Sequence, residues 1–457
     1  MADMVNSPKQ WALYVFFGAN VSDTAVRDNA VQNLLQMATV GSSDKVAVAA
    51  QLHFLGKWAY RYVMPKRPPG SSSKVLTPVE AIPNANSADP ETIIAFFKWA
   101  TKECPAKQAI LVVWGHGYGL DDYLPLGARP HLPGAIPTTK DAQTLKEEAK
   151  PITLTEKIAS SRYKDASLMN LVLDQCALEV LPNGQLGAAA RKCGTELPPE
   201  QELAIIGLDA CTMAMIEVWC ELWGGAQIGI ASEAQVPDAS FPYDRILARL
   251  ILQPEAGPRQ VAQMFVDAYV ESYAYQSDAF VTLSACDLSV EKDHPDLSAI
   301  GLLLKSVKRL ACALIDAAAN QDAREIIFRA RNDSPIFDPD GFIDLGRFCE
   351  ILELTLPDPE VKKACEGVRQ ALEKLVEYAR YSPLDPTLRI SQTTGLSVWF
   401  PPWLEDPWVD IPEEEASIAY LINGYCETKF AQETGWDRFL KFMWGTGRYR
   451  AHCPEVE

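Results

Sequence analysis

The chain has 457 residues, of which 48% are hydrophobic, and its formal net charge at pH 7 is −18. This length exceeds that of most single cores, so we expect a main domain and a second unit. The negative charge repels phosphate backbones and anionic lipid, which argues against nucleic acid and membrane surfaces as partners. No apolar run approaches the roughly 18 residues that span a bilayer.

The amino terminus and the cysteines predict where the protein resides. The apolar stretch WALYVFFG (11–18) follows a single lysine, Lys9, and no clear cleavage site comes after it, so we expect a buried strand and no export signal. Eleven cysteines are scattered without a C-x-x-C pair, which indicates neither a disulfide framework nor a zinc site. A reducing cytoplasm fits this pattern best.

Short apolar strands alternate with helical patterns through the first half of the chain, which is typical of a parallel sheet covered on both faces. We predict strands at residues 11–17, 45–54, 58–64, 109–114, 203–209 and 227–232. This alternation predicts an α/β fold with a mostly parallel central sheet.

One helix is well marked, in the stretch DPETIIAFFKWATKECP (89–105). Asp89 has the side chain of an N-cap and Pro90 occupies the first helical position, while Lys102 and Pro105 mark the end. The residues at helical spacing predict a buried stripe of Ile93, Phe97, Ala100 and Cys104.

The pattern changes twice further along the chain. Residues 121–200 are rich in Pro and Gly and then in basic residues, which predicts a long exposed insertion. From about residue 256 the pattern becomes mostly helical, with one more strand near TGLSVWFPP (394–402). We therefore predict a domain over 1–255 that contains the insertion, and a mostly helical domain over 256–457 that packs on or extends the core.

The stretch ILVVWGHGYG (110–119) raises the question of a phosphate-binding loop. Such a loop needs G-x-G-x-x-G before a helix, or a lysine and a hydroxyl after the last glycine, and neither is present. Asp121 and Asp122 would also repel a phosphate. Instead, His116 follows the carboxyl end of a strand, where open parallel sheets place their ligands. The alternative is a turn histidine without a role.

Cys211 follows another apolar strand, in LAIIGLDACTMAMIEVWCELWGG (203–225). The apolar residues after it predict a helix that begins near Cys211, and a helix N-terminus or a nearby imidazolium lowers the pKa of a thiol. Cys211 is therefore a candidate nucleophile, with an inert buried cysteine as the alternative. Cys176 stands in a similar Asp-x-Cys pattern, but a turn follows it, so we expect a structural role there.

Three stretches together resemble the clostripain family of cysteine peptidases, which are relatives of the caspases: 89–119, 205–222 and GIASEAQVPDASFPYD (229–244). Later segments are also similar, so the resemblance extends over most of the chain. It implies a caspase-like three-layer αβα sandwich and a peptidase that needs no organic cofactor.

The resemblance also implies roles for particular residues. His116, in a His-Gly after a strand, would be the catalytic base, and Cys211, in an Asp-Ala-Cys, the nucleophile. The backbone amides of Gly117 and Cys211 would bind the oxyanion. Asp209 would line the first specificity pocket and select Arg or Lys before the cut bond.

A separate physical argument supports a pocket role for Asp209, because a carboxylate at the floor of a partly dry pocket attracts guanidinium or ammonium strongly. Asp238 would supply a second pocket carboxylate. The competing interpretation is that Asp209 caps the helix that begins near Cys211.

The resemblance further suggests a zymogen, because relatives are activated by cleavage between the two catalytic residues after a basic residue. The interval 121–200 offers Arg129, Lys140, Lys146, Lys150, Lys157, Arg162 and Lys164. The enzyme itself or an upstream protease would cut there. Some relatives depend on calcium, but this sequence has no D-x-D-x-D-G loop, so a Ca²⁺ role has no support in it.

Two rival functions remain at this point. The first is a non-catalytic caspase-like module that binds basic peptides through Asp209, and the second is acyl or peptidyl transfer to an amine. Retention of both His116 and Cys211 favours the peptidase. We expect an intracellular regulatory protease whose substrates expose Arg or Lys, as one step of a bacterial stress or antiviral defence cascade.

Overall fold

The computed structural model describes residues 8–21, 23–53, 58–67, 76–117, 170–174, 179–198, 200–276, 280–291, 293–338, 341–382, 392–401 and 425–443. The statements below concern these residues.

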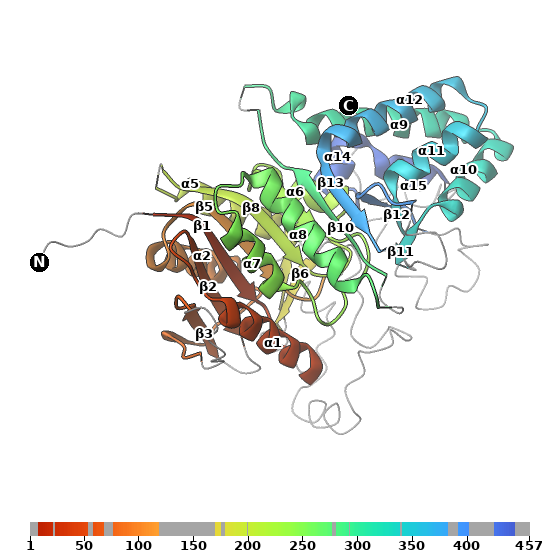
Figure 1. Cartoon of the computed structure of the whole chain (residues 1–457). Helices are drawn as coiled ribbons and strands as arrows, with labels where there is room; N and C mark the ends of the chain where they lie inside the picture. Colours follow the sequence, from red (N-terminus) through yellow and green to blue (C-terminus); the bar gives the residue numbers. More distant parts are fainter. Residues whose placement is uncertain are drawn as a thin grey trace, which may run out of the picture.

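A nine-stranded sheet in the order β13-β10-β9-β8-β5-β1-β2-β3-β4 forms the centre of the molecule (Figure 1). The five strands from β9 to β2 are parallel, and the strands at both edges are antiparallel. Their bounds are Lys9–Phe17 (β1), Val46–His53 (β2), Trp58–Val63 (β3), Glu80–Pro83 (β4), Ala106–Trp114 (β5), Glu202–Asp209 (β8), Ile228–Ala231 (β9), Thr282–Asp287 (β10) and Val376–Tyr381 (β13). The six predicted strands are all present.

Helices cover both faces of this sheet. Alternate residues of β1 pack into two cores, Ala12, Tyr14 and Phe16 into one and Leu13 and Val15 into the other. The first core includes α2 (Pro90–Glu103), α5 (Asn183–Thr195) and α6 (Ile216–Leu222), and the second includes α1 (Thr24–Val40), α7 (Tyr243–Leu252) and α8 (Pro258–Tyr273). Burial on both faces explains why the inner strands read as continuous apolar runs. The result is a three-layer αβα sandwich.

The helix predicted after residue 89 is α2. The Asp89 carboxylate accepts a hydrogen bond from the Glu91 amide, Pro90 is the first helical residue, and Cys104 is the C-cap. Ile93, Phe97 and Ala100 are buried against the sheet, as the spacing predicts.

The second half of the chain contributes to the central sheet as well as to a helical unit. β10 and β13, both after residue 256, form one edge of the sheet, and helices α9 to α12 gather beyond that edge (Figure 1). A three-stranded sheet, β11-β12-β14, lies in this unit. The bounds are Ala299–Ala317 (α9), Gln321–Asp333 (α10), Ile336–Asp338 (β11), Phe342–Asp344 (β12), Leu345–Thr355 (α11), Pro359–Leu375 (α12), Ser397–Trp399 (β14), Lys429–Thr434 (α14) and Trp436–Met443 (α15), with a short 3₁₀ turn, η1, at Pro295–Leu297.

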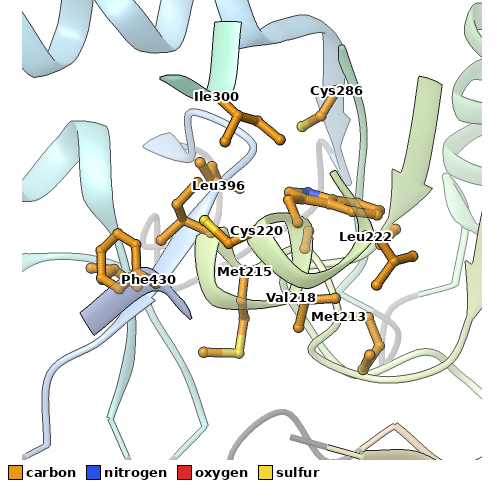
Figure 2. Close-up of a cluster of buried hydrophobic side chains, with 14 of the residues drawn as sticks. Met213, Met215, Val218, Cys220, Leu222, Cys286, Ile300, Leu396 and Phe430 are labelled. Carbon is orange, nitrogen blue, oxygen red and sulfur yellow. The ribbon is translucent and has the colours of Figure 1, made fainter. Parts of the chain in front are cut away.

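The helical unit packs directly on α6. Val218 and Cys220 of α6 belong to a buried hydrophobic cluster (Figure 2). The same cluster contains three residues from the second half of the chain: Ile300 of α9, Leu396, and Phe430 of α14. The segment that follows Cys211 is therefore buried beneath residues from the end of the chain. The boundary near residue 256 itself remains a prediction.

The predicted exposed insertion over 121–200 holds a folded part. Residues 170–174 and 179–182 form the hairpin β6-β7 (Asn170–Asp174 and Glu179–Pro182), and α5 follows it. The prediction of a loose segment is wrong for α5, because Leu186, Ala190 and Cys193 are buried against the sheet layer.

Three observations concern the expectations about membranes, cysteines and metals. Within the described ranges, no helix has the length and apolar character that crossing a bilayer requires. Eight described cysteines are free thiols and Cys426 is disulfide-bonded. The described residues contain no group of three or more His, Cys, Asp or Glu side chains that could hold a metal ion.

Candidate active site

The fold brings the ends of β5 and β8 together. These strands are parallel neighbours, Trp114 is paired with Asp209, and the Gly115 amide donates a hydrogen bond of 3.4 Å to the Asp209 carbonyl. His116 and Cys211 each lie two residues beyond the paired positions. Both candidates therefore emerge at the carboxyl edge of the sheet, where parallel sheets place their ligands.

Gly117 lies in direct contact with the Cys211 backbone. A Cβ atom at residue 117 would lie 2.3 Å from the Cys211 carbonyl oxygen and 2.8 Å from the Cys211 nitrogen. No side chain fits at these distances, so a glycine is required for the two loops to approach each other this closely. The histidine loop and the cysteine loop thus form one continuous surface.

The Cys211 thiol is half-buried and lies against the loop between β9 and α7. Its Sγ accepts a hydrogen bond of 3.2 Å from the Val236 amide and lies 3.8 Å from the Val236 carbonyl oxygen. An N–H donor at a sulfur favours the thiolate. Thr212, the next residue, has a φ of 53°, a left-handed conformation that turns the chain sharply away from β8.

The expected helix start at Cys211 is wrong. Helix α6 begins at Ile216, its N-cap is Met215, and no side chain caps it. The stretch after Cys211 is apolar because it is buried, and the apolar pattern alone could not fix where the helix begins. The Val236 amide donates to this sulfur, whereas the N-terminus of α6 lies five residues further along the chain.

His116 is in an environment that favours the neutral imidazole. Burial lowers the pKa of His116, whereas the charges of Asp23 and Asp238 oppose this shift. A neutral imidazole is the form that can accept a proton from a thiol. Asp23, the N-cap of α1, is a neighbour that the sequence analysis did not identify.

Asp209 is buried, with 2% of its surface exposed. Its Oδ2 accepts hydrogen bonds from the Tyr243 hydroxyl (2.7 Å) and the Phe241 amide (3.3 Å). Its Oδ1 accepts no hydrogen bond of good geometry from the described residues, although the Ser240 side chain lies near. Burial raises the pKa of Asp209 to about 6 against the lowering effect of these hydrogen bonds. Because α6 begins seven residues later, the helix-cap interpretation of Asp209 is wrong.

Aromatic side chains surround Asp209. The Tyr273 hydroxyl donates to the Ser240 carbonyl (2.8 Å), and the Trp114 indole donates to the Ser240 hydroxyl (2.9 Å). Tyr269 is buried near Asp209 and Cys211. Burial raises the pKa of Tyr269 most, and the charges of Tyr273, Asp209 and Cys211 raise it further. The sequence analysis did not identify these tyrosines, because their approach depends on how α7 and α8 pack on the sheet.

Asp238 is exposed, in the same loop as Val236. Its charge raises the pKa of both His116 and Tyr273, so it lies near the histidine and near the aromatic residues around Asp209. The structure thus gathers His116, Gly117, Asp209, Cys211 and Asp238 at one edge of the sheet.

Some residues of the sequence analysis lie outside the described ranges. These are Cys176 and the seven basic residues between 129 and 164. Next to them, the buried carboxylate of Asp174 accepts hydrogen bonds from the Asn20 side chain (2.6 Å) and the Ser87 amide (2.7 Å). These bonds tie β6 to the loops that follow β1 and precede α2.

Comparison with solved structures gives the class of the fold. The chain matches an inactive zymogen C11 protease from Parabacteroides distasonis with a TM-score of 0.58 and 15% identity, over 94% of this chain and 99% of that one. It matches a secreted C11 cysteine protease from Bacteroides thetaiotaomicron, in complex with an irreversible peptide inhibitor, with a TM-score of 0.57 and 14% identity over the same shares. The predicted caspase-like αβα fold is thus confirmed.

The model of the clostripain family matches residues 194–444, more than half of the chain. This protein therefore belongs to the clostripain family of cysteine peptidases, as the sequence motifs predict. The matched range contains Asp209, Cys211 and Asp238, whereas His116 lies before it. No curated protein matches the chain in sequence.

Proposed function

We propose that this cysteine peptidase is an endopeptidase with a catalytic dyad of Cys211 and His116. The observation that carries the proposal is the contact of Gly117 with the Cys211 backbone at the paired ends of β5 and β8. It is supported by a thiol held by a backbone amide and by a histidine whose pKa is lowered by burial.

The reaction follows from these groups. His116 accepts the thiol proton, and the Cys211 sulfur attacks the peptide carbonyl to form a tetrahedral intermediate. The imidazolium then donates its proton to the leaving amine, the C–N bond breaks, and a thioester remains. Water, deprotonated by His116, attacks the thioester and releases the carboxylic acid and the thiol. The Gly117 and Cys211 amides are the proposed donors to the oxyanion.

We assign Asp209 and Asp238 to a pocket that selects Arg or Lys before the cut bond. Support comes from the Oδ1 atom of Asp209, which is buried and receives no hydrogen bond of good geometry from the described residues. A guanidinium or ammonium would satisfy this atom and would favour the ionised carboxylate. The aromatic side chains of Tyr243 and Tyr273 would enclose the aliphatic part of the substrate side chain.

The test is hydrolysis of fluorogenic peptides with Arg, Lys, Asp or Leu before the scissile bond. Wild type and Cys312→Ala, which removes an exposed thiol away from the site, should both cut after Arg and Lys. Cys211→Ala and His116→Ala should not. Activity in the Cys211→Ala variant would refute the dyad, and cleavage after Asp or Leu would refute the pocket.

We further propose that the chain is a zymogen, cut between residues 121 and 200 by itself or by an upstream protease. The inactive zymogen among the similar structures supports this idea for the fold. Intact mass recorded during the assay should show a cut before activity rises. Full activity from one uncut chain would refute it.

The remaining proposals concern the cellular compartment, the substrates and the two competing functions. The eight free thiols support a reducing cytoplasm, whereas the disulfide at Cys426 is a feature of oxidising compartments. The proposed substrates are proteins with exposed Arg or Lys, in a bacterial stress or antiviral defence cascade. No organic cofactor enters the proposed reaction. The non-catalytic module is favoured by a particular result after cleavage between residues 121 and 200. In that result, wild type and Cys211→Ala bind basic peptides equally well and neither protein cuts them. Product masses that show an added amine would indicate transfer.

A further inference from the structure

The loop that holds the Cys211 thiol also carries a buried acid. Val236 donates its amide to Cys211 Sγ, and Glu233 lies three residues earlier in the same loop. Glu233 is 1% exposed, and neither carboxyl oxygen receives a well-aligned hydrogen bond from an N–H or O–H group of the described residues. A buried carboxylate without strong donors is costly, so such a group retains its proton or finds a partner.

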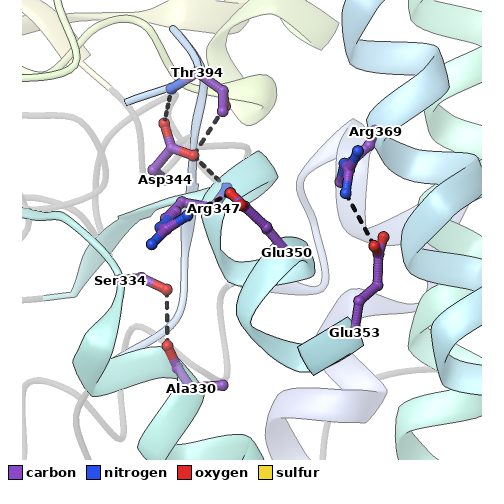
Figure 3. Close-up of polar contacts among 8 residues, drawn as sticks. All are labelled: Ala330, Ser334, Asp344, Arg347, Glu350, Glu353, Arg369 and Thr394. Atoms are coloured by element: carbon purple, nitrogen blue, oxygen red, sulfur yellow. Dashed lines mark hydrogen bonds and ion pairs between the residues drawn. The ribbon is translucent and has the colours of Figure 1, made fainter. Parts of the chain in front are cut away.

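The partner is Asp344, on the C-terminal side of the molecule. Asp344 is the N-cap of α11, and its carboxylate accepts hydrogen bonds from the Arg347 amide (2.6 Å), the Thr394 hydroxyl (2.8 Å) and the Thr394 amide (Figure 3). The Glu233 side chain lies within hydrogen-bonding reach of this carboxylate.

The donors decide which of the two acids holds the proton. Burial raises the pKa of Asp344, but three donors and a helix N-terminus oppose this shift and favour its ionised form. Burial, and then the charge of Asp344, raises the pKa of Glu233 well above its usual range, while Thr393 and Gly395 oppose the shift. Glu233 is therefore the protonated member, and its O–H donates to Asp344.

No charged group within the described residues neutralises Glu233. Cys286 of β10 is a titratable neighbour, and its pKa is raised to about 12 chiefly by burial, so it is a neutral thiol. The Arg347 guanidinium pairs with Glu350 (Figure 3). The hydrogen bond between the two acids is thus the polar link between this loop and α11.

Backbone hydrogen bonds connect the loop that carries Glu233 to the segment that follows Cys211. The Thr212 amide donates to the Ala234 carbonyl (3.1 Å), and the Ala214 amide donates to the Ser232 carbonyl (2.9 Å). The Glu233 amide donates to the Thr282 hydroxyl of β10 (3.1 Å). Residues 232–236, which we call the anchor loop, are therefore joined to the segment after Cys211 on one side and to the C-terminal half on the other.

We propose that Glu233 is a positioning residue that fixes the anchor loop on Asp344 and so keeps the Val236 amide on the Cys211 sulfur. The proposal rests on the proposed role of Cys211 as the nucleophile. Loss of the Glu233 proton would place two buried carboxylates against each other, so the anchor depends on this proton.

The experiment measures alkylation of Cys211 by iodoacetamide between pH 5 and 10, with peptide mass mapping to separate Cys211 from the other thiols. Glu233→Ala should react about ten-fold more slowly than wild type at pH 7, because the hydrogen bond to the thiolate is lost. Glu233→Gln should match wild type at pH 7, since its amide donates to Asp344.

The control is Glu353→Gln, which removes a carboxylate from the same helix α11 that pairs with Arg369 of α12 (2.9 Å; Figure 3). Its alkylation should follow wild type at every pH. A folded Glu233→Ala variant with the wild-type rate would overturn the proposal. If that variant does not fold, Glu233→Met, which fills the same space without donating a hydrogen bond, decides in its place, and a wild-type rate at pH 7 would overturn the proposal.

This assay needs no peptide substrate, so its outcome is independent of the peptidase assay. If Cys211 alkylation depends on Glu233 and no peptide is cut, the positioning role stands and the proposed function fails. If peptides are cut and Cys211 alkylation does not depend on Glu233, the proposed function stands and the positioning role fails.

Discussion

At the scale of single residues, Gly117 controls the approach of the two loops that carry the proposed catalytic residues. Gly117→Ala would place a methyl group 2.3 Å from the Cys211 carbonyl oxygen, which is backbone and cannot move aside cheaply. We expect a loss of more than about 100-fold in kcat/KM, because misplacing a nucleophile by about 1 Å costs that much. Peptide hydrolysis measures the loss, and Gly257→Ala, with nothing within 4 Å of its added Cβ, is the matched control.

Asp209 predicts a pH dependence at the same scale. Its pKa in the free protein is raised to about 6, so below this pH the carboxyl is neutral and above it the carboxylate attracts a guanidinium. We expect kcat/KM for Arg peptides to rise through pH 6. Asp209→Asn should remove this step and lower kcat/KM for Arg peptides about 100-fold. An unchanged pH profile in Asp209→Asn would show that another group selects the substrate.

At the scale of secondary structure, the N-cap of α2 offers a test that does not involve the active site. Asp89→Ala removes the hydrogen bond from the Asp89 carboxylate to the Glu91 amide. We expect a loss of about 1 kcal/mol in the free energy of unfolding, measured by urea denaturation, with the reactivity of Cys211 unchanged. Asp89→Asn, which still caps, should lose much less.

Much of the parallel sheet was predictable, because β1, β2, β5, β8 and β9 are buried on both faces and read as apolar runs. The edge strand β13 was not, since most of its residues are half-buried and VEYARY (376–381) follows a helix without a turn signal. α5 was missed because its Gly and Ala residues carry little amphipathic pattern.

In the candidate site, too, some residues were predictable from the sequence and others were not. His116 and Cys211 follow strand ends, so local pattern and family motif indicate them. The Val236 amide, Tyr243 and Glu233 were not predicted, because each meets the site through a loop or helix whose path depends on tertiary packing. The helix expected at Cys211 was wrong for a related reason, since burial and helical periodicity look alike over a short apolar run.

At the scale of the whole molecule, residues near the end of the chain pack against the half that carries the proposed active site. The Glu217 carboxylate of α6 is buried and accepts hydrogen bonds from the Trp399 amide (2.9 Å) and the Tyr425 hydroxyl. With β10 and β13 in the central sheet, these contacts indicate that the half with the proposed active site depends on residues beyond 256.

Glu217 gives this dependence a measurable pH signature. Burial raises its pKa in the folded protein from 4.5 to about 7, so the folded state binds more protons than the unfolded state between these values. Its contribution to stability is therefore lost as pH rises through this window. Glu217→Gln, which can still accept from both partners, should become more stable relative to wild type between pH 5 and 8, by about 1 to 3 kcal/mol. An equal difference in urea unfolding at both pH values would contradict this.

The central claim, that His116 activates Cys211 as the nucleophile, is tested most directly by labelling with an irreversible peptide inhibitor that carries Arg before its reactive group. After limited cleavage between residues 121 and 200, we predict one adduct, located on Cys211 by peptide mapping. The adduct should be absent from Cys211→Ala and strongly reduced in His116→Ala. An adduct on any other cysteine, or equal labelling of wild type and His116→Ala, would contradict the account.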